Sequence, residues 1–335
     1  MLYKYYRKVE NQEVKEDNEP YLENEKLKKW LLIMPNFDNY MKNNKKKLKI
    51  EIRKGIPDSL RGQVWMKISG AEKLRKARGF LYNELINDIN ENEIIRIPDE
   101  EVIIKDLHRT YPDNLLFKNK LGDGQRELFR ILSCISMKNK KVGYAQGMSF
   151  LVAIFLSYLD EEKSFWMMEN LMKNFRLQEL YLHGFPGLKK NFFVLLKLMK
   201  KLLPNIFTKL ANTKLYPQIY ATSWYLTCFS NVFPFYETIL RIMDCYLFEG
   251  NKIIHRISLA LLALKENEIL QQKTYLEILE IIKTATINVD IDRLFKKSFG
   301  FSISRKKIQK YENLYKEHLN RKTPGDEDIM VQIQM

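Results

Sequence analysis

Residues 53–65 read RKGIPDSLRGQVW, and the helix that this stretch predicts decides the fold class. Pro57 stands where the first residue of a helix belongs, because a proline loses no backbone hydrogen bond there. Leu60, Val64 and Ile68 then recur every four residues. That spacing predicts an amphipathic helix that buries one face against a core.

Outward from this stretch, apolar residues keep returning at helical spacing, and no convincing period-two alternation predicts a strand. Glycine and proline number 13 and 10 of 335 residues, which are too few turn-forming residues for an all-β sandwich or barrel. The hydrophobic share of 45% excludes wholesale disorder. Helices are expected at 23–33, 80–97, 124–137, 148–159, 163–174, 189–203, 207–213, 219–231, 235–248, 252–265, 273–285 and 304–320, with a loop inside 103–120.

The chain is basic, since Lys and Arg exceed Asp and Glu by 15. One lysine run, KNNKKKLKIEIRK at 42–54, has two open interpretations: a solvated face, or a contact with anionic lipid or an acidic partner. No recognised nucleic-acid-binding fold or aromatic interleaving accompanies the basic segments, so no nucleic acid is expected as a partner.

The cysteines and histidines argue against disulfide bonds and against a metal-binding site. Three scattered cysteines and four histidines form no C-x-x-C and no H-x-x-x-H pair. We therefore expect no disulfide framework, no metal site and a reducing compartment. The N-terminus lacks the apolar segment of a secretory signal. Residues 215–236 carry no charge, but their prolines and polar side chains favour buried helices over a membrane span.

The motifs of a self-sufficient enzyme are missing from the sequence. Neither G-x-x-x-x-G-K-[ST] nor G-x-G-x-x-G occurs, and there is no G-x-S-x-G and no kinase signature. Carboxylates are plentiful, but no pair stands out as an acid/base couple. Any catalytic role must therefore rest on other residue types.

Four segments instead form a recognisable series. After 53–65 comes an I-x-x-D-x-x-R-T pattern at 103–110, and then GYAQGM at 143–148, which contains Y-x-Q-G. The fourth segment holds Ser223-Trp224, Phe229, Pro234, Arg241-Ile242-Met243-Asp244 and Gly250. In this order and spacing the segments closely resemble the TBC-domain family, the GTPase-activating proteins for Rab GTPases. The resemblance covers about residues 53–270.

Two departures from the family pattern are small. Met243 stands where the family usually has Trp beside Asp244, which affects packing rather than chemistry. Ser149-Phe150 follow Met148 where many members have Asn-Asp.

The resemblance implies an all-α, two-lobed TBC domain at 53–285, with an N-lobe at about 53–160 and a C-lobe at about 161–285. Residues 1–52 would form a basic lead-in, partly helical or flexible. Residues 286–335 would form a C-terminal helical extension with a frayed tail.

The resemblance also implies a dual-finger mechanism. Hydrolysis of GTP spreads charge over phosphoryl oxygens, so a helper needs a permanent cation and an amide that orients water. The Arg of I-x-x-D-x-x-R matches Arg109, and the Gln of Y-x-Q-G matches Gln146, which would replace the GTPase's own glutamine in trans. The two lie 37 positions apart, with one amphipathic helix between them. Gly147 would let the backbone approach a partner closely.

Other motif residues would support these two. Asp106 would share a face with Arg109 if their segment is helical, and so could hold the guanidinium. Tyr144 would pack under its loop, and Thr110 would hydrogen-bond locally. Arg61 would lie over the indole of Trp65 or hold the first helix in place. The supporting set is Ile103, Asp106, Thr110, Tyr144, Gly147 and Arg61, and the structural set is Gly55, Pro57, Trp65, Trp224, Arg241 and Asp244.

The expected function is therefore that of an enzyme activator rather than an enzyme, acting on a GTP-bound Rab-family GTPase in vesicle trafficking. It would carry no cofactor of its own, since GTP and Mg²⁺ belong to the partner. The expected location is the cytoplasm, with peripheral contact to anionic endomembranes left open. Two alternatives stand: a non-catalytic Rab-binding effector or scaffold with a TBC fold, and a peripheral membrane protein that works through its lysine-rich lead-in.

Overall fold

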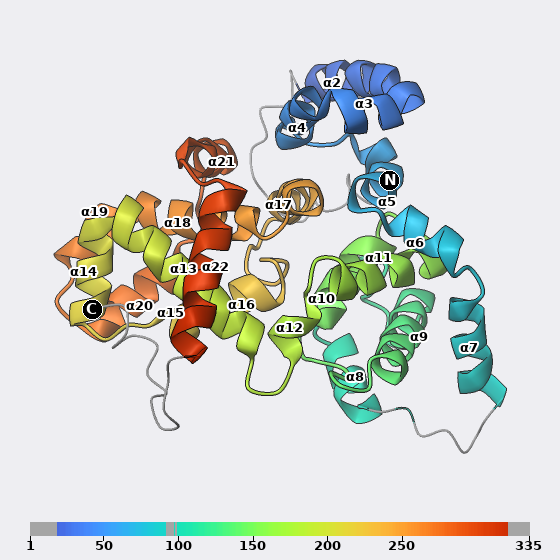
Figure 1. Cartoon of the computed structure of the whole chain (residues 1–335). Coiled ribbons are helices and arrows are strands. Elements are labelled where there is room, and N and C mark those ends of the chain that lie inside the picture. The colour runs from blue at the N-terminus through green and yellow to red at the C-terminus, as the bar shows by residue number, and fades with distance from the viewer. Residues whose placement is uncertain (1–18, 92–96, 98, 321–335) are drawn as a thin grey trace. The chain divides into compact units, whose positions relative to one another are not determined.

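The computed structural model describes residues 19–91, 97 and 99–320. Contacts divide the chain into two compact units (Figure 1). The N-terminal unit holds the described residues up to Asn174 together with Ile239–Phe248. The C-terminal unit holds Phe175–Thr238 and the described residues from Glu249 onward.

The helices of the N-terminal unit are short and follow one another closely. They are α2 (Glu19–Ile33), α3 (Phe37–Asn43), α4 (Lys45–Lys54), α5 (Arg61–Ser69), α6 (Ala71–Ala77), α7 (Leu81–Glu91), α8 (Glu100–Leu107), α9 (Asp123–Lys138), α10 (Met148–Leu156), α11 (Glu161–Lys173) and most of α17 (Tyr236–Glu249). Two 3₁₀ turns, η1 (Met34–Asn36) and η2 (Asp58–Leu60), join some of them.

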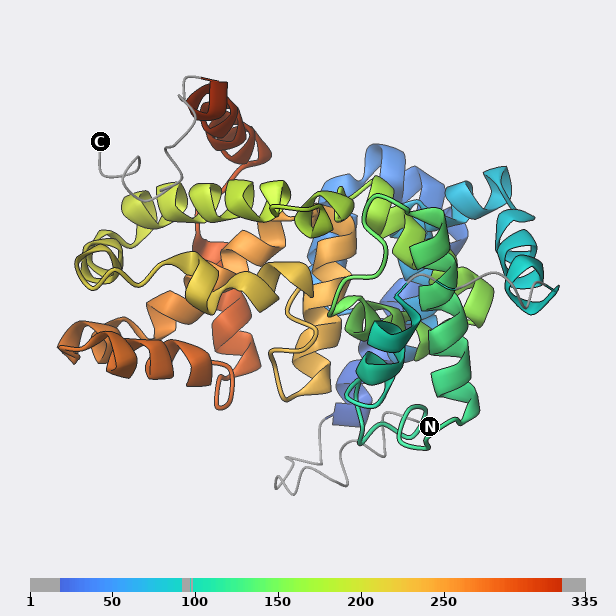
Figure 2. The ribbon, with the colours of Figure 1, turned by 90° about the horizontal axis from the view of Figure 1, so that it is seen from below.

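The C-terminal unit is built around α13 (Pro186–Leu202), which packs against α12 (Gln178–Tyr181), α14 (Pro204–Asn212), α18 (Lys252–Leu264) and α22 (Arg305–Asn320). Figure 2 shows α22 beside α13 in a second view, with its axis inclined to that of α13. Its other helices are α15 (Pro217–Tyr220), α16 (Thr222–Leu226), α19 (Glu266–Gln271), α20 (Tyr275–Thr284) and α21 (Ile291–Gly300).

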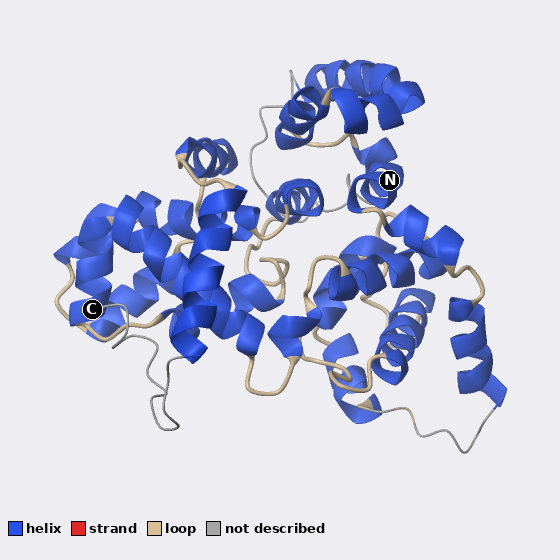
Figure 3. Cartoon of the chain, in the orientation of Figure 1, coloured by secondary structure: helices blue, strands red, loops and turns tan. Residues whose placement is uncertain are grey.

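The all-α class expected from the sequence is confirmed, because the described residues contain helices and loops but no strand (Figure 3). Two details differ. Pro57 does not begin a helix: it precedes η2 in an extended conformation, and α5 starts at Arg61. The single helix expected at 219–231 is broken into α15 and α16, followed by Cys228 and Phe229 with positive φ angles of 50° and 67°.

The described part of the basic lead-in contributes to the core of the N-terminal unit. Residues 19–54 are largely helical, and Trp30, Phe37, Leu48 and Ile52 are buried. In α4 the lysines occupy the outer face, while Leu48 and Ile52, one turn apart, point inward. Because lysines surround Leu48 and Ile52 in the sequence, this short apolar stripe cannot be recognised there.

No helix in the described ranges combines the length and apolarity needed to cross a bilayer. Within the uncharged stretch 215–236, the structure places α15, α16 and turns. The terminal tail expected to fray lies outside the described residues from 321 onward.

The core of the N-terminal unit brings two loops together. Nearly all of α10 is buried, as its all-round apolar sequence predicts, and it packs against α9 and α11. On α9, Leu128, Leu132 and Ile135 form the buried stripe that the sequence predicts. Because α8 packs on both α9 and α10, the loop that follows α8 lies beside the loop that precedes α10.

A buried carboxylate on α17 anchors the start of α5. Asp244 accepts hydrogen bonds from the Ile56 amide at 3.0 Å and from the Trp65 indole at 2.7 Å, and its Oδ1 lies 3.3 Å from Nε of Arg61. Burial raises the pKa of the Asp244 carboxyl, while the charge of Arg61 and these hydrogen bonds act to lower it. The first motif and the fourth are thus held together within one unit.

Arg61 does not lie over the Trp65 indole. Its guanidinium sits 5.2 Å from the ring centre of Tyr158 and also pairs with Asp58. Burial alone would lower the pKa of Arg61, but Asp244, Tyr158 and Asp58 together raise it, so the group stays charged. The other expectation for Arg61, that it holds the first helix in place, agrees with these contacts.

Replacing Asp244 by Ala is expected to lower the free energy of unfolding of the N-terminal unit by about 3–5 kcal/mol, because the buried Arg61 would lose its fully buried counter-charge and the Trp65 indole and the Ile56 amide would lose their acceptor. Urea denaturation followed by circular dichroism measures this change. Asp38→Ala on α3 is the matched control, since Asp38 is exposed, and it should shift the free energy by less than about 0.5 kcal/mol. A loss below about 1 kcal/mol for Asp244→Ala would contradict the anchoring role.

Candidate functional site

Arg109 lies just past the C-terminal end of α8, with its side chain 48% exposed. One of its Nη atoms donates to Oδ1 of Asp106, which is almost fully buried on the inner face of the same helix. The ion pair holds the guanidinium from its protein side. The positive end of the side chain is therefore fixed in direction while it stays open to solvent.

Gln146 comes from the loop before α10 and is exposed. In the amide orientation that satisfies hydrogen bonding, its Oε1 lies 2.7 Å from Nη2 and 3.0 Å from Nη1 of Arg109. Gly147 follows with a φ of 100°, a left-handed value that favours glycine, and it caps the start of α10. Two residues 37 positions apart in the sequence are thus adjacent at the surface of one unit.

Tyr144 links the two loops from below. Its ring is buried, and its hydroxyl donates to Oδ2 of Asp106 at 2.5 Å. Burial, followed by the hydrogen bond to Asp106, raises the pKa of Tyr144, so the phenol keeps its proton and remains a donor. Asp106 therefore holds Arg109 with one oxygen and the Tyr144 loop with the other.

Thr110 makes a second link. Its hydroxyl donates to the Asp106 carbonyl at 2.6 Å and lies 2.7 Å from the hydroxyl of Ser149 on α10. Ser149 is one of the departures from the family pattern, and here it forms part of a buried polar contact. Ile103 is fully buried on the inner face of α8, where it supports the helix that ends at the site.

Asp99 is a site residue that the sequence reasoning missed. Its Oδ2 accepts from the Tyr144 amide at 2.7 Å and from the Ser136 hydroxyl at 3.1 Å, so it joins the start of α8 to α9 and to the Gln146 loop. A Cβ on Gly143 would lie 2.4 Å from the same oxygen. Asp99 has a positive φ of 62°, which the structure alone reveals. In the sequence Asp99 and Gly143 belong to no shared motif, so no signal there links them.

Replacing Asp99 by Ala is expected to speed hydrogen exchange at the Tyr144 amide about tenfold or more, because that amide loses its acceptor. Exchange measured by mass spectrometry on peptides that cover 143–147 tests this. Ser136→Ala, which leaves the Asp99–Tyr144 bond in place, is the matched control and should leave exchange at Tyr144 near the wild-type rate. Equal exchange in wild type and Asp99→Ala would contradict the role given to Asp99.

The remaining motif residues fall into two groups. Near the start of α5 the structure gathers Gly55, Pro57, Arg61, Trp65, Arg241 and Asp244. Within this group Gly55 has a φ of 101°, and Arg241 donates to the Arg53 carbonyl at 3.4 Å. Trp224 belongs to the C-terminal unit, where it is buried and stacked on Phe229 with ring centres 5.5 Å apart.

The arrangement around Arg109 has defined chemical abilities. A half-exposed guanidinium held by a buried carboxylate can bind phosphate oxygens as a permanent cation. The carboxamide of Gln146 offers one donor group and one acceptor group to a water molecule. Across the residues that the structure describes, no three His, Cys, Asp or Glu side chains gather as a metal ion would need.

Comparisons with known proteins identify the family of this chain. The family model described as Rab-GTPase-TBC domain matches residues 58–270. TBC1 domain family member whacked from Drosophila melanogaster is 34% identical over 235 residues, which are 70% of this chain and 63% of that protein. Rab GTPase-activating protein tbc-11 from Caenorhabditis elegans is 32% identical over 297 residues, 87% of this chain and 31% of that protein. The matched regions thus span less than two thirds of either relative.

Two solved structures share the fold. The Chlamydomonas flagellar RabGAP TBC domain has a TM-score of 0.67 at 28% identity, covering 83% of this chain and 94% of that one. The Ypt/Rab-GAP domain of Gyp1p has a TM-score of 0.65 at 20% identity, covering 85% of this chain and 99% of that one.

Proposed function

The chain belongs to the Rab-GTPase-TBC domain family, and from this membership we propose that it is a GTPase-activating protein for a GTP-bound Rab-family GTPase. Arg109 and Gln146 are the residues that it supplies in trans. The observation that carries this proposal is their adjacency: a half-exposed guanidinium and an exposed carboxamide lie 2.7 Å apart on two neighbouring loops of the N-terminal unit.

Arg109 acts as the arginine finger in this mechanism. Phosphoryl transfer to water builds charge on the oxygens around the γ-phosphorus, and a positioned guanidinium stabilises that charge. Asp106 keeps the guanidinium oriented before the GTPase arrives, so little reorganisation is needed when the nucleotide enters. Asp106 is thus a positioning residue, and Tyr144 fixes it from the other side.

Gln146 acts as the water-orienting amide. Its oxygen faces Arg109 in the free protein, so the carboxamide exchanges this partner for the attacking water and the GTPase when the complex forms. It thereby takes the place of the GTPase's own glutamine. GTP and Mg²⁺ are contributed by the partner, and this chain contributes no cofactor.

The location that this proposal implies is the cytoplasmic side of the endomembranes that carry the GTPase. There the protein would end the GTP-bound state and so limit vesicle traffic.

A single-turnover assay against a panel of GTP-loaded Rab GTPases tests the proposal. At least one member should hydrolyse its GTP about 10³-fold faster or more with the full chain than alone. Tight binding of a GTP-loaded member without faster hydrolysis would overturn the activator function and favour the non-catalytic effector or scaffold. No binding and no stimulation across the whole panel would remove Rab GTPases as the partner.

A further inference from the structure

Two long segments of the C-terminal unit contain no acidic residue. Residues 180–236 hold seven lysines and no Asp or Glu. Residues 293–311 hold seven Lys and Arg and again no Asp or Glu. The first segment includes all of α13, and the second includes the first turns of α22.

The fold brings these two segments together. The Phe193 ring on α13 contacts Tyr315 on α22, with ring centres 5.4 Å apart. Eight residues onward along α13 and eight residues back along α22 lie Lys201 and Lys307, and the charge of Lys201 acts on Lys307. The two helices therefore cross with opposite chain directions, and the last turn of α13 is near enough to the first turns of α22 for the charge of Lys201 to act on Lys307.

The result is a surface that we call the basic face, formed by Lys201, Lys306, Lys307 and Lys310. All of these except the half-buried Lys307 are exposed. Burial, and then the charge of Lys201, lower the pKa of Lys307, which is the effect expected when ammonium groups crowd together. The three α22 lysines also follow Arg305 at the positive end of that helix, which adds to the repulsion.

This charge has no counter-charge in the described part of the chain. Neither Lys201 nor any of the three α22 lysines pairs with a described carboxylate. Other lysines of the same unit do have partners: Lys190 pairs with Glu179 at 2.8 Å, and Lys252 pairs with Glu249 at 2.6 Å. Concentrated, unpaired charge on one exposed face is the feature that an external polyanion would neutralise.

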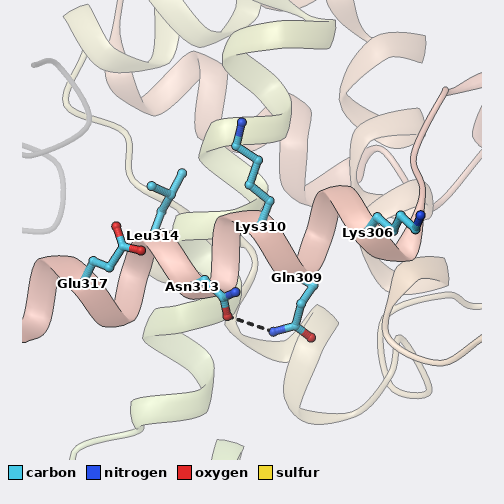
Figure 4. A pocket seen from close by; sticks show the side chains of 6 residues that line it. All are labelled: Lys306, Gln309, Lys310, Asn313, Leu314 and Glu317. Carbon is cyan, nitrogen blue, oxygen red and sulfur yellow. Dashed lines mark hydrogen bonds between the residues drawn. The ribbon is translucent and has the colours of Figure 1, made fainter.

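We propose that the basic face docks on the surface of an anionic lipid bilayer. Lysine is a compact, hydrated point charge, which suits diffuse attraction to many headgroups. A site for one small phosphate would instead need donors that converge from separate elements. The depression beside Lys306 and Lys310 is about 470 Å³ and shallow, and the side chains that line it all come from α22 (Figure 4).

Vesicle co-sedimentation with the full chain tests the proposal. Wild type should bind phosphatidylserine-containing vesicles, should not bind neutral phosphatidylcholine vesicles, and should lose affinity as salt rises. Each lysine near an anionic surface strengthens binding about fivefold, so four Gln substitutions should weaken it about 100-fold or more. The test variant carries Lys201→Gln, Lys306→Gln, Lys307→Gln and Lys310→Gln.

A control variant that removes the same charge elsewhere separates this face from net charge. It carries Lys42→Gln, Lys45→Gln, Lys46→Gln and Lys47→Gln in and before α4, and it should retain affinity within about threefold of wild type. Equal losses in the two variants, a loss under about fivefold in the test variant, or equal binding of wild type to neutral vesicles would each overturn the proposal.

Two further readouts complete the experiment. The test variant should keep the wild-type thermal midpoint and should stimulate a soluble GTPase normally, so failure of the membrane proposal is distinguishable from failure of the activator function. Binding of wild type to an acidic protein but not to anionic vesicles would assign the face to a protein partner and reject the bilayer.

Discussion

Replacing Arg109 by Ala is expected to reduce stimulated GTP hydrolysis by the partner GTPase about 10³-fold or more, close to the unstimulated rate. An arginine finger contributes on the order of 10³–10⁵ in rate, which corresponds to roughly 4–7 kcal/mol of transition-state stabilisation. Arg109 is the cation that the Asp106 carboxylate and the Gln146 amide contact, so the substitution removes the positive charge that these two groups orient. Single-turnover hydrolysis on the most responsive GTPase of the panel gives the measurement.

Arg109→Lys tests whether charge alone is sufficient. Lysine keeps the positive charge but lacks the planar fork that reaches two oxygens at once, so most of the stimulation should still be lost. Arg78→Ala, at an exposed arginine in the α6–α7 connection of the same unit, is the matched control and should keep the wild-type rate. Stimulation by Arg109→Ala within about threefold of wild type would refute the finger assignment.

The thermal midpoint of Arg109→Ala has to be compared with that of wild type, because the substitution removes a partner from Asp106. That carboxylate is buried and would keep only the Tyr144 hydroxyl on its side-chain oxygens. An unsatisfied buried acceptor costs about 1–3 kcal/mol, so a modest loss of stability is expected. A low rate of the Arg109→Ala variant supports catalysis by Arg109 only if the variant is folded.

The helical class was predictable because its signal is local. The apolar stripe of α9 and the all-round apolar sequence of α10 depend on residues within a few turns of each other, and both elements appear where the pattern places them. That the two loops flanking α9 lie side by side did not follow from these patterns, since only the mechanism implied by the family resemblance required it. The breaks at Cys228 and Phe229 were not predictable, because tertiary packing holds those residues at positive φ.

The site's support was less predictable than its two exposed residues. Motif residues can be found by pattern, but the bond between Asp106 and Tyr144 joins residues 38 positions apart, and that of Asp99 to the Tyr144 amide joins residues 45 apart. Nothing in the spacing fixes such a contact. Arg61 makes the same point, since four residues separate it from Trp65 and yet its guanidinium stacks on Tyr158.

The basic lead-in shows a third reason why the sequence predicts only part of the fold. Composition alone predicts that a segment dominated by lysines is solvated. In α4, however, the two buried side chains of Leu48 and Ile52 are enough to hold the helix against the rest of its unit. A stripe of two residues is below what periodicity can distinguish from chance. In the basic face of the C-terminal unit, the sequence suggests too little rather than too much exposed charge. Its lysines lie in two separate segments and form one feature only when α13 and α22 pack together.

Gln146→Ala is expected to be about as damaging as Arg109→Ala, with a loss of roughly 10³-fold in stimulated hydrolysis. The decisive substrate is a GTPase whose own catalytic glutamine has been replaced by Ala. If Gln146 supplies the amide in trans, wild-type protein should still stimulate that GTPase, and Gln146→Ala should stimulate neither form of it. Gln146→Glu should fail as well, because a carboxylate lacks the donor and would form an ion pair with Arg109.

The double variant then distinguishes the two roles available to Gln146. Residues that act together in one transition state lose little more when both are removed, so Arg109→Ala with Gln146→Ala should be close to either single variant. If Gln146 only oriented Arg109 in the free protein, wild type would fail on the glutamine-free GTPase while still stimulating the normal one. That pattern would leave Arg109 as the finger and would reduce Gln146 to a positioning residue, because its oxygen contacts the guanidinium in the unbound state.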